Sequence, residues 1–336
     1  MTSWSSAWRG LLAGFIACAG AFASVPAAIA QTGAAAGFPS RVVRITLPYA
    51  AGAGPSVFLH ILADQLGKQW GQQVIVESRP GASGFIAIEA VKKVEPDGYE
   101  LLVASNAHAA INPWLYKKVP YDMEKDFVPI GMIYTTPFFI TVSSSGPYQT
   151  VPALIAGAKA NPGKLSLGTP YVGSPADLGG ALFESLTGTT EIHVPFKDQP
   201  QIYTAIANND VTWTLSTLGS ALPLLNAGKL KLLAIAGDKR SPSQPDVPTI
   251  QEAGGPAGLE VSSWMGMFGP RGLPPELQSK INADLAKALN DPGVREHLKQ
   301  LGFEAYIATP PEVTAAIKAD LVKYHELVKR TGATAD

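Results

Sequence analysis

The chain has 336 residues, and its 26 lysines and arginines nearly balance its 27 aspartates and glutamates, for a formal net charge of −1. A near-neutral chain of mixed charge gives no electrostatic reason to bind nucleic acid or an anionic membrane surface, so neither is expected as a partner. The single cysteine, Cys18, lies in a segment that we expect to be removed, so the mature chain is predicted to have no disulfide and no thiol nucleophile.

Residues 1–30 have the features of a secretory signal peptide. Arg9 precedes an apolar run from Leu11 to Val25, and Ala28-Ile-Ala30 provides the small-x-small sequence that signal peptidase accepts. We therefore expect cleavage between Ala30 and Gln31 and export to the periplasm. No later stretch reaches about 18 uncharged apolar residues, so the mature protein is expected to be soluble.

A lipidated N-terminus at Cys18 is the alternative for this leader. Phe15-Ile-Ala17 lacks the leucine that a lipoprotein signal usually has three positions before its cysteine. Cleavage after Ala30 is therefore the preferred interpretation.

The first part of the mature chain alternates between strand-like and helix-like patterns. The predicted elements are a strand over 41–47, a helix over 57–70, a strand over 74–76, a helix from Gly84 to Val94 and a strand over 99–104. This alternation predicts a parallel sheet covered by helices on both faces.

The same alternation returns after Val142. The predicted elements are helices over 151–160, 174–186 and 199–207, and strands over 164–167, 192–194, 211–215 and 230–236. Three helices then follow over 274–289, 292–301 and 311–329, each with proline near its start. Helices this late in the chain need a sheet to cover, and the first group of strands has the fewest helices of its own.

The simplest architecture is therefore α/β with two domains, the first formed by residues 31–140 plus 241–336 and the second by residues 141–240. A chain that crosses between domains at least twice forms a hinge at the crossings.

Two glycine-rich loops run directly from a predicted strand into a predicted helix: Pro48-Tyr-Ala-Ala-Gly-Ala-Gly-Pro-Ser56 and Gly168-Thr-Pro-Tyr-Val-Gly-Ser-Pro175. Glycine lets the backbone approach a ligand, and Ser56 and Ser174 can cap the helices. The free N–H groups of a helix start bind anions without arginine or lysine. Because ligands of open α/β sheets bind at the carboxyl ends of strands, one such loop in each domain suits a ligand with two carboxylates.

An ordinary turn before a helix is the alternative for either loop alone, and their recurrence at matching places favours a binding site. The candidate ligand-binding residues in the loops are Tyr49, Gly52, Ala53, Gly54, Pro55, Ser56, Gly168, Thr169, Tyr171, Gly173 and Ser174. Further candidates at strand ends are Asn106, His108, Ser216 and Thr217, with His108 either neutral or donating to a carboxylate.

The sequence offers little support for catalysis. Ser83 lies in Gly81-Ala-Ser-Gly-Phe85, which misses the nucleophile-elbow pattern G-x-S-x-G at its last position. Gly52-Ala-Gly54 begins like a dinucleotide-binding fingerprint, but Val57 occupies the place of the third glycine. No catalytic residue and no cofactor are predicted.

The five histidines are scattered, so no metal site is predicted. His60, His297 and His325 are expected on solvated helix faces, and His193 is expected to end a strand and orient the loop that follows it.

A series of short sequences resembles the Bug family, the extracytoplasmic solute receptors of tripartite tricarboxylate transporters. The resemblance runs from Pro39 to about Gly332. The sequences that carry it are Glu77-Ser-Arg-Pro-Gly-Ala-Ser-Gly84, Pro96-Asp-Gly-Tyr-Glu-Leu-Leu102, Asn112-Pro-Trp-Leu-Tyr116, Pro120-Tyr-Asp122, Asp126-Phe127, His193-Val-Pro-Phe-Lys197, Ala227-Gly-Lys-Leu230, Asp246-Val-Pro-Thr249 and Glu252-Ala-Gly254.

The resemblance implies a two-domain periplasmic-binding-protein architecture of the Venus-flytrap type. Such a receptor closes on a carboxylate held between the loop after the first strand and the matching loop of the second domain, and delivers it to the membrane permease subunits. The family also implies a monomer. A receptor that signals to a membrane sensor kinase would use the same closed form and is the alternative.

One departure from the family bears on the ligand. Where the family often has P-G-G-x-x-D, this chain has Ala51-Gly-Ala-Gly-Pro-Ser56, so Ser56 stands at the place of a frequent acid. A neutral hydroxyl cannot pair with an ammonium group, which argues against an amino-acid ligand. A second departure is Asn208-Asn209 in place of two glycines, which asparagine tolerates because it can adopt positive φ.

Aromatic rings near the loops point to the ligand type. Tyr49, Tyr171 and Phe196 would place rings beside the cleft and Pro55 would stiffen its wall, which favours an aromatic dicarboxylate such as terephthalate over citrate. The alternative is that these rings only pack beneath the loops.

Overall fold

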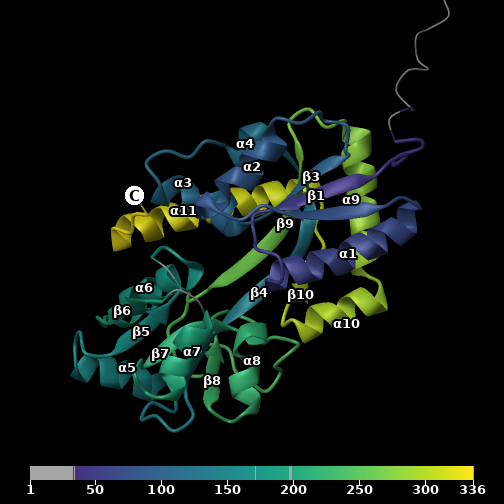
Figure 1. Ribbon diagram of the computed structural model, residues 1–336. Helices are drawn as coiled ribbons and strands as arrows, with labels where there is room; N and C mark the ends of the chain where they lie inside the picture. Colours follow the sequence, from purple (N-terminus) through teal and green to yellow (C-terminus); the bar gives the residue numbers. More distant parts are fainter. Residues whose placement is uncertain (1–32, 34, 171, 197–198, 336) are drawn as a thin grey trace, which may run out of the picture.

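The computed structural model describes residues 33, 35–170, 172–196 and 199–335 (Figure 1). The predicted signal peptide (1–30), with Cys18, and Tyr171 lie outside the described residues, so what the sequence predicts for them stays a prediction. Within the described part of the chain, no helix combines the length and the apolar character that crossing a membrane requires.

The first strand group begins with three parallel strands that are connected by helices, as predicted. Its elements are β1 (Val43–Leu47), α1 (Gly54–Trp70), β2 (Val74–Ser78), the 3₁₀ turn η1 (Ala82–Gly84), α2 (Phe85–Lys92) and β3 (Glu100–Ser105). β1 lies between β2 and β3. Val43, Ile45 and Leu47 are fully buried because α1 and the C-terminal helices pack against them.

Two long antiparallel strands connect the two ends of the sheet. β4 (Phe127–Ser143) and β9 (Ser262–Pro270) pair with each other, and β9 also pairs with β3. The predicted parallel pairing holds for β1, β2 and β3, but β9 and β4 add antiparallel pairs, so the sheet is mixed. β4 was not predicted because it contains Pro129 and Pro137, and proline is rare inside strands. The structure accommodates Pro129 with a shift in the register between β4 and β9 just after it.

The second strand group comprises β5, β6, β7 and β8 with the C-terminal part of β4. The strands are β5 (Ser166–Thr169), β6 (Ile192–Pro195), β7 (Trp213–Thr217) and β8 (Leu230–Ile235), and the helices are α5 (Val151–Ala160), α6 (Pro175–Thr187), α7 (Gln199–Ala207) and α8 (Leu218–Asn226). β5, β6 and β7 are parallel, as predicted, whereas β4 runs antiparallel to both β7 and β8. α8 was not predicted, and Pro223 inside it interrupts the helical pattern. Asn209 has a φ of 66°, as expected for its place in the sequence.

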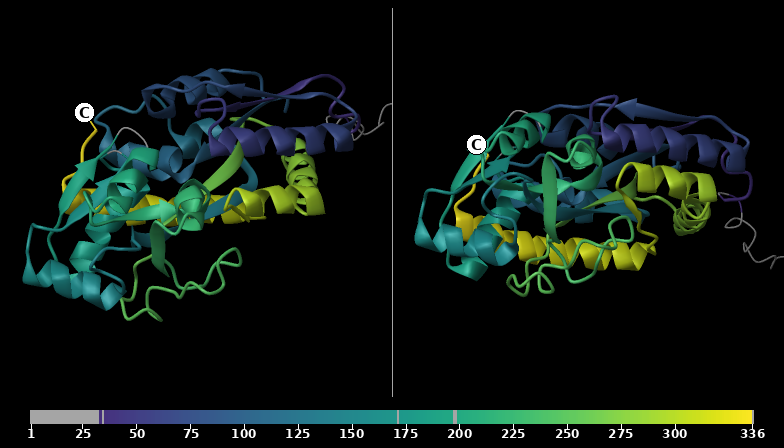
Figure 2. Two further views of the ribbon diagram at one scale, coloured as in Figure 1. Left: turned by 60° about the horizontal axis from the view of Figure 1, so that its bottom comes forward. Right: turned by 90° about the horizontal axis from the view of Figure 1, so that it is seen from below.

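Short elements and three C-terminal helices complete the fold. They are the π-helical turn η2 (Ala107–Ile111), α3 (Asn112–Leu115), α4 (Met123–Asp126), α9 (Pro275–Leu289), α10 (Pro292–Gln300), β10 (Glu304–Ala305) and α11 (Pro310–Thr331). α9 and α10 pack on α1, and Ile281 and Leu285 share a core with Ile45. α11 (yellow in Figure 2) runs along the side of both strand groups and contacts η2, β4 and α6. The exact domain limits taken from the sequence stay a prediction.

Candidate ligand-binding site

The described residues line a cavity of about 260 Å³ where loops of the first strand group face the β5–α6 loop. Its lining consists of Pro48, Tyr49, Gly81, Ser83, Gly84, Ala107, His108, Ile111, Asn112, Leu115, Tyr116, Val172 and Gly173. These residues follow the carboxyl ends of β1, β2, β3 and β5, which is the edge where α/β sheets bind ligands.

A hydrogen-bonded chain fixes the protonation of His108 on one wall. The Tyr49 hydroxyl donates to Ser105 Oγ at 3.0 Å, and Ser105 Oγ lies 2.8 Å from His108 Nδ1. The Ser105 backbone N–H also donates to Nδ1, at 3.2 Å. Since Nδ1 accepts this backbone N–H, it carries no proton, and the neutral ring has its hydrogen on Nε2. Burial lowers the pKa of His108 to about 4, so the ring is neutral at physiological pH.

The η1 loop forms the second part of this wall. Gly81, Ala82, Ser83 and Gly84 all have positive φ, between 45° and 115°. The Asn112 side-chain amide holds the loop by donating to the Ser83 carbonyl at 3.0 Å, and Ser83 Oγ is hydrogen-bonded to the Tyr116 hydroxyl. Non-glycine residues adopt this conformation rarely, so two of them here indicate a loop that its surroundings hold in place.

Gly84 is required because His108 lies against it. A Cβ at Gly84 would lie 2.3 Å from His108 Cδ2. The imidazole of His108 is thus held between the η1 loop and Ser105, and it faces the cavity as a donor that carries no charge.

The opposite wall comes from the β5–α6 loop. Val172 is 48% exposed, and Gly173 packs so closely on Leu115 that a Cβ there would lie 2.5 Å from Leu115 Cδ1. Ser174 caps α6 by accepting the N–H of Asp177, as predicted. Within the helix, the expectation of free N–H groups is therefore wrong for Asp177, whose N–H Ser174 occupies. The N–H of Gly173, in the loop just before the N-cap, is also occupied, because it donates to Asp177 Oδ2 at 2.7 Å.

Three predicted site residues, Tyr49, His108 and Gly173, come together in this cavity. Its lining also includes residues that were not predicted as ligand contacts, namely Gly81, Ser83 and Gly84 of the η1 loop and Asn112, Leu115 and Tyr116. Arg79-Pro-Gly-Ala-Ser-Gly84 is a glycine-rich sequence after a predicted strand, so a signal for the η1 loop was present.

The residues at the start of α1 lie outside the cavity lining. α1 begins at Gly54 with Ala53 as its N-cap, and Pro55 and Ser56 belong to its first turn. The expectation that Ser56 caps this helix is wrong, because Ser56 is buried and its Oγ lies 3.3 Å from Ser78 Oγ. Gly52 has a φ of 84° and open space around it. Ligand contact by these five residues stays a prediction.

The other predicted site residues also lie elsewhere, each with a structural partner. Asn106 is buried and donates to the Ser262 carbonyl and the Tyr324 hydroxyl. Ser216 Oγ lies 2.5 Å from Thr141 Oγ1, and Thr217 Oγ1 lies 2.6 Å from Ser220 Oγ.

Gly168 and Thr169 are buried in β5, where the Ile202 side chain leaves no room for a Cβ at Gly168. Phe196 packs against the core that contains Ile202. These contacts agree with the alternative that the Phe196 ring only packs beneath its loop. Ligand contact by Phe196 stays a prediction.

No charged side chain is among the described residues that line the cavity. The described part of the chain also holds no cluster of histidine, cysteine or acidic residues suited to a metal. His60, His297 and His325 are exposed, as predicted. The cavity therefore presents neutral hydroxyl, amide and imidazole groups beside the rings of Tyr49 and Tyr116.

Comparison with known proteins gives one consistent picture. Residues 58–333 match the family described as the tripartite tricarboxylate transporter family receptor. Protein BugT of Bordetella pertussis is 30% identical over 320 residues, which cover 95% of this chain and 95% of BugT.

Two solved structures of Rhodopseudomonas palustris proteins are similar over nearly their whole length. Rpa4515 with adipate is 30% identical with a TM-score of 0.78, covering 88% of this chain and 99% of that one. MatC with bound malate is 27% identical with a TM-score of 0.72, covering 87% and 100%. The predicted α/β periplasmic-binding-protein fold is thereby confirmed.

Proposed function

The chain belongs to the tripartite tricarboxylate transporter receptor family, and we propose that it captures an organic dicarboxylate in the cavity between Tyr49, the η1 loop, η2 and the β5–α6 loop. The preferred ligand in this proposal is an aromatic dicarboxylate such as terephthalate. The family consists of binding proteins and not of enzymes, so the rival interpretation of the pattern around Ser83, a periplasmic hydrolase, is excluded.

The observation that carries the proposal is the fixed tautomer of His108. Its Nε2–H can donate to a ligand oxygen, while Nδ1 is occupied by the Ser105 N–H. A carboxylate is a strong acceptor for such a donor, and it needs no cation when the donor is held in place in a site shielded from water. Ser83 Oγ lies on the same wall and supplies a further hydroxyl group.

The ring preference rests on Tyr49 and Tyr116, which both line the cavity. Offset or edge-on contacts between aromatic rings stabilise a complex by about 0.5–1.5 kcal/mol beyond area burial. A volume of about 260 Å³ is close to the lower end of the usual range for small-molecule sites and suits a compact ligand. Adipate and malate, the ligands in the two related structures, are both dicarboxylates.

The two walls of the cavity come from different strand groups, which suggests how a ligand is captured. Gly173 and Val172 come from the second strand group and the rest of the lining from the first, so a ligand that contacts both stabilises the closed form. Export to the periplasm, a monomeric state and delivery to permease subunits complete the proposal. A receptor that serves a membrane sensor kinase would bind in the same way, and an uptake assay in a strain lacking the gene distinguishes the two.

A thermal-shift screen tests the proposal. The purified protein is heated with aliphatic and aromatic mono-, di- and tricarboxylates and with amino acids, and a specific ligand stabilises the folded state by about RT ln(1 + [L]/Kd). A selective shift with terephthalate supports both ligand class and ring preference. A shift only with adipate, malate or citrate removes the ring preference, and a shift only with aspartate or glutamate overturns the proposed ligand class.

A further inference from the structure

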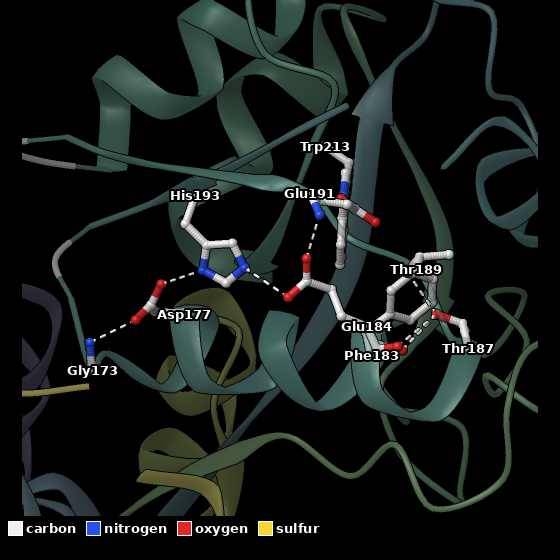
Figure 3. Close-up of polar contacts among 9 residues, drawn as sticks. All are labelled: Gly173, Asp177, Phe183, Glu184, Thr187, Thr189, Glu191, His193 and Trp213. Atoms are coloured by element: carbon white, nitrogen blue, oxygen red, sulfur yellow. Dashed lines mark hydrogen bonds and ion pairs between the residues drawn. The ribbon is translucent and has the colours of Figure 1, made fainter. Parts of the chain in front are cut away.

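A line of polar contacts leads from the cavity wall to β6, the edge strand of the second strand group (Figure 3). The Gly173 N–H donates to Asp177 Oδ2 at 2.7 Å, and Asp177 Oδ1 lies 2.6 Å from His193 Nδ1. On its other side His193 Nε2 lies 3.4 Å from Glu184 Oε2. Gly173 lines the cavity, whereas His193 lies on β6 and is not among the lining residues.

The contacts of His193 favour the doubly protonated ring. Both ring nitrogens face carboxylates of α6: Nδ1 is hydrogen-bonded to Asp177, and Nε2 makes no hydrogen bond but lies 3.4 Å from Glu184 Oε2, where a positive charge on the ring is favourable. The hydrogen bond to Asp177 and the nearby carboxylate of Glu184 raise the pKa of His193 to about 9. An imidazolium therefore sits between Asp177 and Glu184 at physiological pH.

The other neighbours of His193 do not replace these partners. The carboxylate of Glu191, just before β6, accepts a hydrogen bond from the Trp213 indole N–H, and burial raises the pKa of Glu191 to about 7. Leu167, the partner of His193 on β5, is apolar. Among the described residues, Asp177, Glu184 and Glu191 are the titratable groups that face His193.

Asp177 is the link between this cluster and the ligand site. One oxygen holds the N–H of Gly173 and the other holds His193, so the position of the carboxylate sets the position of the cavity wall. Gly173 has a φ of 77° and packs on Leu115 of the first strand group. A small movement of this residue therefore changes the space that is available to a ligand.

We propose that Asp177 and His193 are positioning residues of the ligand site, which hold Gly173 in its binding position without contacting the ligand. This inference rests on the proposed function for its effect on affinity, but the contact to Gly173 exists without a ligand. Loss of the His193 proton leaves one ring N–H for two carboxylates, so the hold on Asp177 weakens at alkaline pH.

The test uses Asp177→Ala and His193→Gln, with His297→Gln as the matched control on the exposed face of α10. Asp177→Ala keeps the Ser174 hydroxyl as a cap for α6, which limits the risk of misfolding. The first readout is the ¹H–¹⁵N spectrum of the ligand-free protein, in which the Gly173 amide proton reports its hydrogen bond. The second is the Kd for adipate and for terephthalate at pH 7.5 and 9.5.

We expect the Gly173 amide proton to lie downfield in the wild type and in His297→Gln, and to move upfield in Asp177→Ala. Affinity should fall about tenfold in Asp177→Ala, the equivalent of one hydrogen bond to a charged group. Wild-type affinity should fall about threefold from pH 7.5 to 9.5, and His193→Gln should lack this fall.

The inference is overturned if the Gly173 amide is unchanged in Asp177→Ala, or if that variant binds as tightly as the control. An alkaline loss of affinity that persists in His193→Gln also overturns it. If the wild type binds neither acid, the proposed ligand is wrong, and the Gly173 amide alone then decides the positioning role.

Discussion

Gly84→Ala should disable the ligand site through its contact with His108. The new Cβ would lie 2.3 Å from His108 Cδ2, 2.5 Å from Nε2 and 3.1 Å from Pro48 Cβ. The ring must retreat by roughly 1 Å to reach an ordinary carbon–carbon contact. Ser105 lies on the other side of the ring, with its N–H 3.2 Å from Nδ1, so the ring cannot move straight back and must turn out of this hydrogen-bonded position.

The expected loss of stability has two parts. The φ of Gly84 is 88°, and a Cβ in the left-handed region costs roughly 1–2 kcal/mol. The weakened hydrogen bonds between Ser105 and His108 add about 1–2 kcal/mol. We therefore expect the free energy of unfolding to fall by about 3 kcal/mol, and carboxylate affinity to fall more than tenfold because the Nε2–H donor is displaced.

Gly71→Ala is the matched control. Gly71 has a φ of 65° and ends α1, but nothing lies within 4 Å of the added Cβ. It should lose only the roughly 1–2 kcal/mol of backbone strain and keep its affinity. Urea unfolding and calorimetric titration of both variants measure the two quantities. Equal affinity and equal stability in the two variants would refute the account of the Gly84–His108 contact.

Three further outcomes are expected. Asn106→Ala removes two hydrogen bonds that Asn106 donates, to Ser262 and Tyr324, and one that it accepts from Ser263 Oγ. At about 1 kcal/mol each, the free energy of unfolding should fall by about 3 kcal/mol at unchanged affinity; lost affinity at unchanged stability would instead make Asn106 a ligand contact. Trp213→Phe removes the N–H that Glu191 accepts. Burial raises the pKa of Glu191 to about 7, so the stability tied to its protonated form is present below its unfolded pKa and lost as the pH rises through 7. The indole N–H stabilises the ionised carboxylate and limits that loss, so urea unfolding of Trp213→Phe should show a larger deficit at pH 8 than at pH 6. His108 has a lowered pKa of about 4, so its contribution is present above its unfolded pKa of about 6.5 and lost as the pH falls through 4. His108→Gln should be less sensitive to acid in that window, and an unchanged acid profile would count against a buried neutral ring.

The regular βαβ units were predictable because each has its own local pattern. The helices over 151–160 and 199–207 match α5 and α7 at both ends. β4 was not predictable, because Pro129 and Pro137 lie inside it and its stability comes from pairing with β7, β8 and β9. Because these pairing partners are distant in the sequence, β4 shows no local periodicity from which a strand could be predicted.

The ligand site was only partly predictable, for a similar reason. Tyr49, His108 and Gly173 follow strand ends, so topology alone brings them together. Asn106, two residues before His108, is instead buried and donates hydrogen bonds to Ser262 and Tyr324. The π-helical turn η2 determines that His108 and not Asn106 lines the cavity, and no sequence pattern predicts such a turn.

The most direct test of the central claim is calorimetric titration of the purified wild-type protein with terephthalate, adipate and malate at pH 7.5. We expect saturable one-to-one binding of at least one of these dicarboxylates, tightest for terephthalate, and more than tenfold weaker binding in Gly84→Ala. No heat of binding with any of the three, or binding that Gly84→Ala leaves unchanged, would contradict the claim that this cavity is a dicarboxylate site.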